Sequence, residues 1–338
     1  AGLMPVYAAL SGEPRPATVL TIHNIAYQGW FPPSLLGDLH LPAHCYHLEG
    51  VEYFGGIGFL KAGLRYADRL TTVSPTYARE IQSAEYGCGL EGLLSARTDD
   101  LHGILNGVDY AIWNPATDSH LVAPYDHDRL EGKASNKAAL QAEFGLEVDA
   151  SAPLFAMVSR LTWHKGADLL PEVLPALVAR GGQMVLLGTG DADLENALRA
   201  LASAHPGSIR VHIGYDEAQA HRIQAGADVL MVPSRAEPCG LTQLYALRYG
   251  TLPLVRRTGG LEDTVIDATP AALADNCATG FAFDEPTTHA LGWAIRRALD
   301  LYRTPERWRT LQTRAMTRDF SWTASARAYL ELYRGVAR

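Results

Sequence analysis

The sequence predicts an α/β protein built on parallel strands. Short, nearly continuous apolar runs alternate with amphipathic stretches along most of the 338 residues. Apolar runs of this kind are typical of parallel strands covered on both faces. The regular alternation of strand and helix indicates βαβ units in a doubly wound sheet. Because a single core rarely extends beyond about 250–300 residues, the length indicates two domains.

Each predicted strand is a short apolar run, and the helical stretches place leucines along one face. The predicted strands are residues 17–24, 70–74, 102–105, 154–159, 184–188, 209–214, 229–234 and 252–257. The predicted helices are residues 168–180, 193–205, 240–250 and 322–333.

The strands divide unevenly along the chain. Residues 149–318 are expected to form one complete α/β domain with six strands, whereas residues 1–113 supply only about three strands. The polar, irregular stretch 114–148 is predicted to be the domain linker. Residues 319–338 are expected to form a C-terminal helix that packs back on the N-terminal domain. The first domain is therefore predicted to be incomplete, and a chain that starts at Ala1 suggests a missing N-terminal portion.

Composition argues against several functional classes. The net charge is −8, with 37 acidic and 29 basic residues, and no basic stripe is present, so we expect no nucleic-acid partner. No apolar run approaches the roughly 18 residues that span a bilayer, so we expect no membrane association. The cysteines lie far apart, as is typical of a reduced cytoplasmic protein. They are Cys45, Cys88, Cys239 and Cys277.

Candidate site residues gather where the predicted strands end. In open α/β sheets, ligands bind outside the carboxyl ends of the strands. Cations, glycines, an aromatic residue and a carboxylate follow the strands at these positions. They are His23, Asn24, Arg160, Lys165, Gly188, Tyr215, Glu237, Cys239, Gly240, Leu241 and Thr242.

Arg160 and Lys165 could be an ordinary exposed pair of cations at the start of a helix. Their place at the end of a strand favours an anion site instead. Arginine offers a forked set of donors and lysine a compact charge, a combination suited to a diphosphate.

Glu237 lies in a Pro-Cys-Gly turn that opens the helix predicted over 240–250. Backbone N–H groups of Gly240, Leu241 and Thr242 would point outwards there, where phosphate binds well. Because two adjacent anions repel, we expect Glu237 to face sugar hydroxyls rather than phosphates. The alternative is a surface ion pair between Glu237 and Arg235.

Weaker signals point to other classes of protein. Gly188 and Gly190 suggest a dinucleotide loop, but Asp193 occupies the third glycine position, which disfavours an NAD-linked oxidoreductase. We therefore interpret these glycines as a turn of close approach near the ligand. Tyr215 is more often expected to be a packing aromatic, with stacking on a nucleobase as the minority hypothesis.

The only metal-like cluster is formed by His40, His44, Cys45 and His47. Its spacing matches no zinc pattern, so we interpret it as an ordinary loop and expect no metal.

Several long motifs make the sequence similar to bacterial glycogen synthases, with plant starch synthases as the nearest related group. The similarity covers essentially the whole chain in family order. The matching motifs are residues 21–29, 73–80, 103–109, 158–162 with Lys165 and Gly166, 237–245 and 249–260.

The resemblance implies a fold of the GT-B type, in which two Rossmann-like domains face a cleft. It implies that residues 149–318 bind the donor and that residues 1–113 belong to the acceptor side. The family transfers glucose from ADP-glucose to the non-reducing end of an α-1,4-glucan such as glycogen, with retention at the anomeric carbon. It needs no bound metal or other cofactor.

The family's roles map onto individual residues of this sequence. Arg160 and Lys165 would neutralise the departing diphosphate, assisted by the amides of residues 240–242. Glu237 would hold the glucose hydroxyls and stabilise the oxocarbenium-like carbon. Gly188 and Cys239 would line the donor pocket.

Further roles fall to residues on either side of the expected cleft. His23 and Asn24 would hydrogen-bond the glucose from the other domain. Tyr215 would stack on adenine, and Asn106 would lie near the donor.

Two departures from the family pattern are visible. Tyr245 stands where the wider fold often has a second glutamate, so a carboxylate contact with ribose is not expected. The Lys-x-Gly-Gly-Leu-Gly-Asp loop does not occur, and roughly the first third of the family protein is absent. We therefore expect poor or no activity from this chain alone. The alternative is a non-catalytic fragment that binds a nucleotide sugar or a glucan.

Overall fold

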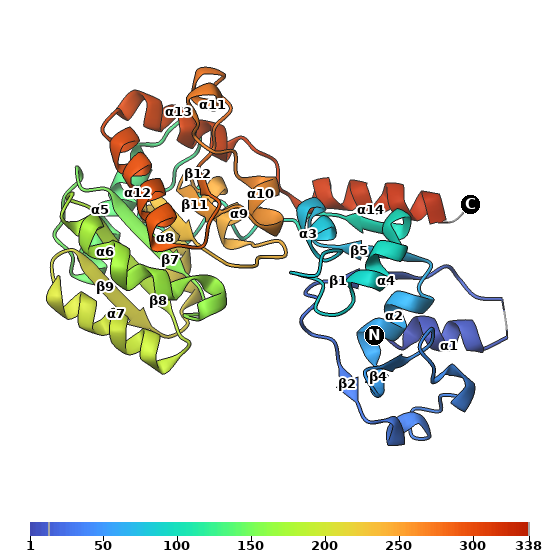
Figure 1. Ribbon diagram of the computed structural model, residues 1–338. Coiled ribbons are helices and arrows are strands. Elements are labelled where there is room, and N and C mark those ends of the chain that lie inside the picture. Colours follow the sequence, from blue (N-terminus) through green and yellow to red (C-terminus); the bar gives the residue numbers. More distant parts are fainter. Residues whose placement is uncertain (13, 337–338) are drawn as a thin grey trace. The chain divides into compact units, whose positions relative to one another are not determined.

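A computed structural model describes residues 1–12 and 14–336 (Figure 1). The chain folds into two compact units. The first unit consists of Ala1–Asn106 together with Thr323–Arg338, and the second consists of Gly107–Trp322.

The second unit is built on a six-stranded sheet in which every pair of neighbours is parallel. The strand order is β12-β11-β10-β7-β8-β9, which confirms the doubly wound α/β prediction. Five strands match predicted segments, and β12 has only three residues, too few to form a recognisable apolar run. The strands are β7 (Leu154–Val158), β8 (Gln183–Gly188), β9 (Ile209–Ile213), β10 (Val229–Val232), β11 (Leu252–Arg256) and β12 (Phe281–Phe283).

Both faces of this sheet are apolar and covered by helices. In the central strands, alternate side chains enter separate clusters: Phe155 and Met157 point into one, and Leu154 and Ala156 into the other. Burial on both faces explains why the strands appear in the sequence as continuous apolar runs. The helices are α5 (Glu131–Phe144), α6 (Leu170–Val178), α7 (Ala192–Ala204), α8 (Glu217–Gly226), α9 (Thr242–Arg248), α10 (Gly259–Thr264), α11 (Pro270–Ala274), α12 (Thr288–Tyr302) and α13 (Pro305–Met316).

The first unit contains the three predicted parallel strands in the order β1-β5-β6. They are β1 (Val19–Ile22), β5 (Arg69–Thr72) and β6 (Leu101–Gly103). A small antiparallel sheet was not predicted because its strands have two or three residues each. Its strands are β2 (Trp30–Phe31), β3 (Glu52–Tyr53) and β4 (Gly56–Gly58).

Helices of the first unit come from both ends of the chain. They are α1 (Met4–Leu10), α2 (Phe59–Tyr66), α3 (Pro75–Glu80), α4 (Glu91–Ala96) and α14 (Trp322–Val336). Ser325 of α14 donates a hydrogen bond of 2.7 Å to the carbonyl of Leu105. The C-terminal helix therefore joins the N-terminal unit, apart from its first residue.

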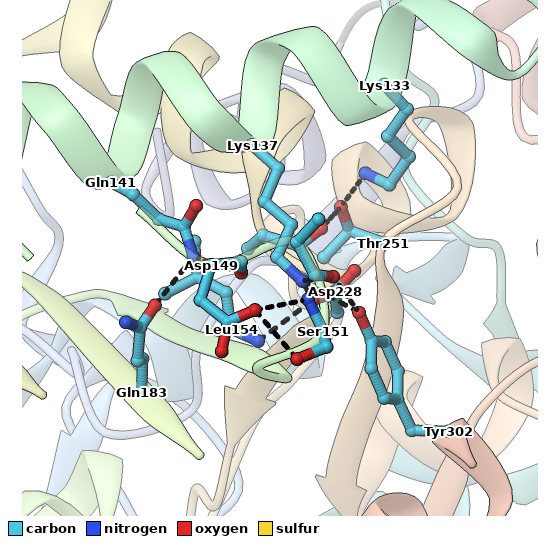
Figure 2. A network of polar contacts seen from close by, with 12 residues as sticks. Lys133, Lys137, Gln141, Asp149, Ser151, Leu154, Gln183, Asp228, Thr251 and Tyr302 are labelled. Atoms are coloured by element: carbon cyan, nitrogen blue, oxygen red, sulfur yellow. Dashed lines mark hydrogen bonds and ion pairs between the residues drawn. The ribbon is translucent and has the colours of Figure 1, made fainter. Parts of the chain in front are cut away.

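The prediction of a linker at residues 114–148 is wrong. The chain leaves the first unit after Asn106, and the predicted linker belongs to the second unit. Within it, α5 packs against α8, and most of the side chains that it buries are polar (Figure 2). Because Lys133, Lys137 and Gln141 face inwards, the helix lacks the apolar stripe that would identify it.

The two lysines find their partners near the amino ends of β10 and β11. Lys133 Nζ donates to the carbonyls of Ala225 and Tyr249 and to Thr251 Oγ1, at 2.9, 3.1 and 2.7 Å. Lys137 Nζ forms an ion pair of 2.7 Å with Asp228 Oδ2. The network anchors α5 to the sheet at the edge opposite the candidate site.

Burial makes the charge state of Lys133 a determinant of stability. Desolvation lowers the pKa of its ammonium from 10.5 to about 7. The unfolded chain therefore binds more protons than the folded chain between these two values, and the contribution of Lys133 to the free energy of unfolding rises with pH across that window.

We expect this rise to reach at most about 1.4 kcal/mol per pH unit. Urea unfolding of the wild type and of Lys133→Met, between about pH 7 and 9.5, measures it. The variant should lack the increase attributable to Lys133. Equal pH slopes in the two proteins would contradict the prediction.

Candidate functional site

The candidate site of the second unit lies on two loops that follow β7 and β10. The loop after β7 contains two short 3-10 turns, Trp163–Lys165 and Ala167–Leu169. Gly166 separates them at φ 71°. A Cβ at this position would lie 2.2 Å from the carbonyl oxygen of Pro233, so glycine allows the two loops to pack directly.

An ion pair that the sequence did not predict joins these two loops. Lys165 Nζ lies 2.6 Å from Glu237 Oε2, and Ser234 Oγ donates to the same oxygen at 2.9 Å. Glu237 is 8% exposed. The alternative surface pair of Glu237 with Arg235 is not formed, because Arg235 binds Asp168 instead.

Arg160 follows β7 directly and is exposed. In the described part of the chain no carboxylate forms an ion pair with its guanidinium. It therefore differs from Lys165, which already has an acidic partner, and its forked donors remain available to an anion.

The turn that precedes α9 is held from behind by α10. The backbone N–H of Gly260 lies 3.1 Å from the carbonyl oxygen of Glu237 and 3.2 Å from that of Pro238. Helix α9 begins at Thr242, two residues later than predicted, and the amides at its start lack partners within the helix. Cys239 is buried and forms no disulfide, so its side chain packs within the turn and does not reach the surface.

The glycines at the end of β8 let the loop after β7 pass close by. A Cβ on Gly188 would lie 1.8 Å from the carbonyl oxygen of Ser159. Glu195, which the sequence did not single out, accepts hydrogen bonds from Thr189 Oγ1 at 2.8 Å and from the Gly190 amide at 2.9 Å. The Gly190 N–H is the main cause of a lowered pKa for Glu195.

Aromatic side chains take two different roles at this edge. Tyr215 follows β9 and is 84% exposed, so its interpretation as a packing aromatic is wrong. Tyr245 stacks on Trp113 at 3.8 Å, and His221 stacks on Trp113 at 3.7 Å. Trp113 lies 132 positions before Tyr245, and no local pattern could have indicated this stack.

The remaining candidates lie in the first unit, at the carboxyl edge of its parallel sheet. His23 follows β1 and is exposed. Asn24 is half-buried, and its Oδ1 accepts a hydrogen bond of 2.9 Å from the Ala26 amide. Asn106 follows β6 and is half-buried. The structure therefore gathers three candidates in this unit and the others in the second unit.

Across residues 1–12 and 14–336, no group of three or more His, Cys, Asp or Glu side chains is arranged to hold a metal ion. Over the same residues, none of the helices has the length and hydropathy needed to cross a membrane.

Known proteins resemble the chain over nearly its whole length. Residues 1–96 match the family model described as starch synthase catalytic domain, and residues 141–313 match that described as glycosyl transferases group 1. The glycogen synthase of Rhodopseudomonas palustris is 55% identical over 98% of this chain and 69% of its own length. That of Albidiferax ferrireducens is 56% identical over 98% of this chain and 68% of its own length.

Solved structures confirm the GT-B fold. The catalytic domain of starch synthase IV from Arabidopsis thaliana, bound to ADP and acarbose, is 35% identical with a TM-score of 0.92, covering 99% of this chain and 70% of that one. A sucrose-phosphate synthase from Thermosynechococcus elongatus, 22% identical with a TM-score of 0.57 over 82% of this chain and 60% of that one, shares the fold alone. These matches do not bear out the expected loss of activity.

Proposed function

Because the chain belongs to the glycogen synthase family of glycosyltransferases, we propose that it transfers glucose from ADP-glucose to the non-reducing end of an α-1,4-glucan, with retention at the anomeric carbon. The similar starch synthase, solved with ADP and acarbose, supports a nucleotide-sugar donor and a glucan acceptor. The single observation that carries the proposal is the contact between Lys165 and Glu237.

This contact holds opposite charges side by side, and in the proposed reaction the glycosidic bond of the donor is cleaved next to them. Cleavage of the glycosidic bond develops positive charge on the sugar carbon and negative charge on the departing diphosphate. A carboxylate beside an ammonium group is complementary to both charges at once, and such preorganised charge stabilises a transition state. Glu237 serves the sugar and Lys165 the diphosphate.

Glu237 keeps one oxygen for the sugar. Both of its contacts use Oε2, and Oε1 accepts no hydrogen bond from any residue that the structure describes. Oε1 then accepts hydrogen bonds from glucose hydroxyls and lies near the anomeric carbon. Arg160 and the amides of Gly240, Leu241 and Thr242 add positive charge around the diphosphate.

The other candidates complete the donor site. The exposed ring of Tyr215 stacks on adenine, and the glycine turn at Gly188 lines the diphosphate. His23 and Asn24 stay predicted contacts of the glucose, and Asn106 stays a predicted neighbour of the donor. The reaction needs no metal, because the cations and amides named above supply the positive charge. We place the enzyme in the cytoplasm, in keeping with four cysteines that form no disulfide.

The proposal is tested by incubating the protein with radiolabelled ADP-glucose and glycogen. We expect label in glycogen, released as glucose by an enzyme that cleaves α-1,4 linkages. UDP-glucose serves as the control donor and should be used far less well. If ADP binds in calorimetry but no label enters glycogen, the non-catalytic binding fragment replaces this proposal.

A further inference from the structure

We propose that Arg235 and Asp168 are positioning residues that hold Lys165 and Glu237 in register. This inference rests on the proposed function. The two residues form what we call the Arg235–Asp168 clamp, which joins the loop after β7 to the loop after β10.

The clamp is bidentate and its arginine is largely enclosed. Arg235 Nη1 lies 2.6 Å from Asp168 Oδ1, and Nη2 lies 2.9 Å from Oδ2. The side chains of Arg235 and Asp168 are 14% and 28% exposed. Two parallel hydrogen bonds between planar groups fix both distance and angle, which a single point charge cannot do.

Arg235 also contacts the two residues that precede Lys165 in the sequence. Nη1 also donates to the carbonyl of Trp163 at 2.6 Å, and the guanidinium carbon lies 4.2 Å from the centre of the Trp163 ring. The backbone N–H of Arg235 lies 2.9 Å from the carbonyl oxygen of His164. Arg235 thus holds residues 163, 164 and 168, which flank Lys165 on both sides.

The same arginine lies two residues before Glu237 and is itself fixed. Arg256 Nη1, at the end of β11, donates to the carbonyl of Arg235 at 2.7 Å. Glu237 and Lys165 therefore belong to loops that share one rigid connection. The ion pair between Lys165 and Glu237, at 2.6 Å, joins residues that are 72 positions apart in the sequence.

Loss of the clamp should affect catalysis more than folding. A displacement of about 1 Å in a catalytic group can lower a rate by about 100-fold. We expect Arg235→Gln to lower kcat between about tenfold and 100-fold. The unfolding temperature should fall no further than it does when a comparable ion pair elsewhere in the unit is removed.

The chain offers such a control. Arg222 binds Glu143 through two hydrogen bonds of 2.7 and 2.9 Å, and these side chains are 29% and 30% exposed. This pair joins α8 to α5, away from both loops of the site. Arg222→Gln should therefore leave kcat unchanged, while it lowers the unfolding temperature about as much as Arg235→Gln does.

The experiment measures kcat, KM for ADP-glucose and the unfolding temperature of Arg235→Gln, Asp168→Asn and Arg222→Gln. Each clamp variant is then combined with Lys165→Ala. If the clamp acts through Lys165 and Glu237, Arg235→Gln should lower kcat greatly alone but little in the Lys165→Ala background. Arg235→Lys should recover part of the loss, because it restores one charged contact.

The outcomes separate this inference from the proposed function. If the wild type transfers no glucose, the proposed function fails. If Lys165→Ala lowers kcat while Arg235→Gln and Asp168→Asn match Arg222→Gln, the clamp is overturned. The clamp is also overturned if the fold-decrease in kcat of the double variant equals the product of the decreases caused by Arg235→Gln and Lys165→Ala alone. If Arg235→Gln does not fold, Asp168→Asn, which keeps the side-chain shape, decides the question.

Discussion

Replacing Glu237 by alanine is expected to lower kcat for glucosyl transfer by roughly 10²–10³-fold, the range found when a preorganised charge is removed from a transition state. The affinity for ADP should remain largely unchanged, because ADP lacks the sugar that Glu237 contacts. The carboxylate is nearly buried and held by Lys165 and Ser234, so its orientation is set before the donor binds.

Two further variants make this experiment specific. Glu237→Gln keeps the shape of the side chain and removes its charge, so it should also lose most of the activity. Glu143→Ala removes a carboxylate that is paired with an arginine far from the site, and it should retain wild-type kcat. Calorimetry with ADP accompanies the kinetic assay. Loss of ADP binding in Glu237→Ala would show that this carboxylate does not lie beside the sugar.

Lys165→Ala is expected to have the second large effect, and on both kcat and ADP affinity. The ammonium group stabilises negative charge that is present in bound ADP and increases as the bond breaks. We expect kcat to fall by roughly 10²–10³-fold. The affinity for ADP should fall as well, and the difference between wild type and variant should shrink as salt is added.

The pattern across the two variants distinguishes their roles. Glu237→Ala should separate turnover from ADP binding, whereas Lys165→Ala should reduce both. Arg199→Ala removes an exposed cation on α7 and serves as the matched control. Unchanged ADP affinity and kcat in Lys165→Ala would contradict the placement of the diphosphate beside this residue.

The predictable part of the fold is the part that buries continuous apolar runs. Strands β7, β8, β10 and β11 are covered on both faces, so their sequences alone identify them. Helix α5 was missed because it buries Lys133 and Lys137, whose partners are carbonyls and a carboxylate from distant positions. Charged residues are seldom buried unless paired, and a pairing partner far along the chain is invisible to local pattern.

The candidate site divides in the same way. The positions of Lys165 and Glu237 could be predicted because each follows a recognisable strand. Their mutual contact could not, since 72 residues separate them. The surface pair of Arg235 with Glu237 was only the alternative interpretation, and the structure pairs Arg235 with Asp168, because the fold brings the loop after β7 alongside it.

The central claim is that the carboxyl edge of the second unit binds the donor through the loops after β7 and β10. A structure of the protein with ADP-glucose bound tests it most directly. The account predicts the diphosphate within hydrogen-bond distance of Arg160, Lys165 and the amides that open α9, with a glucose hydroxyl on Glu237 Oε1. A diphosphate bound elsewhere, or a glucose that does not contact Glu237, would contradict it.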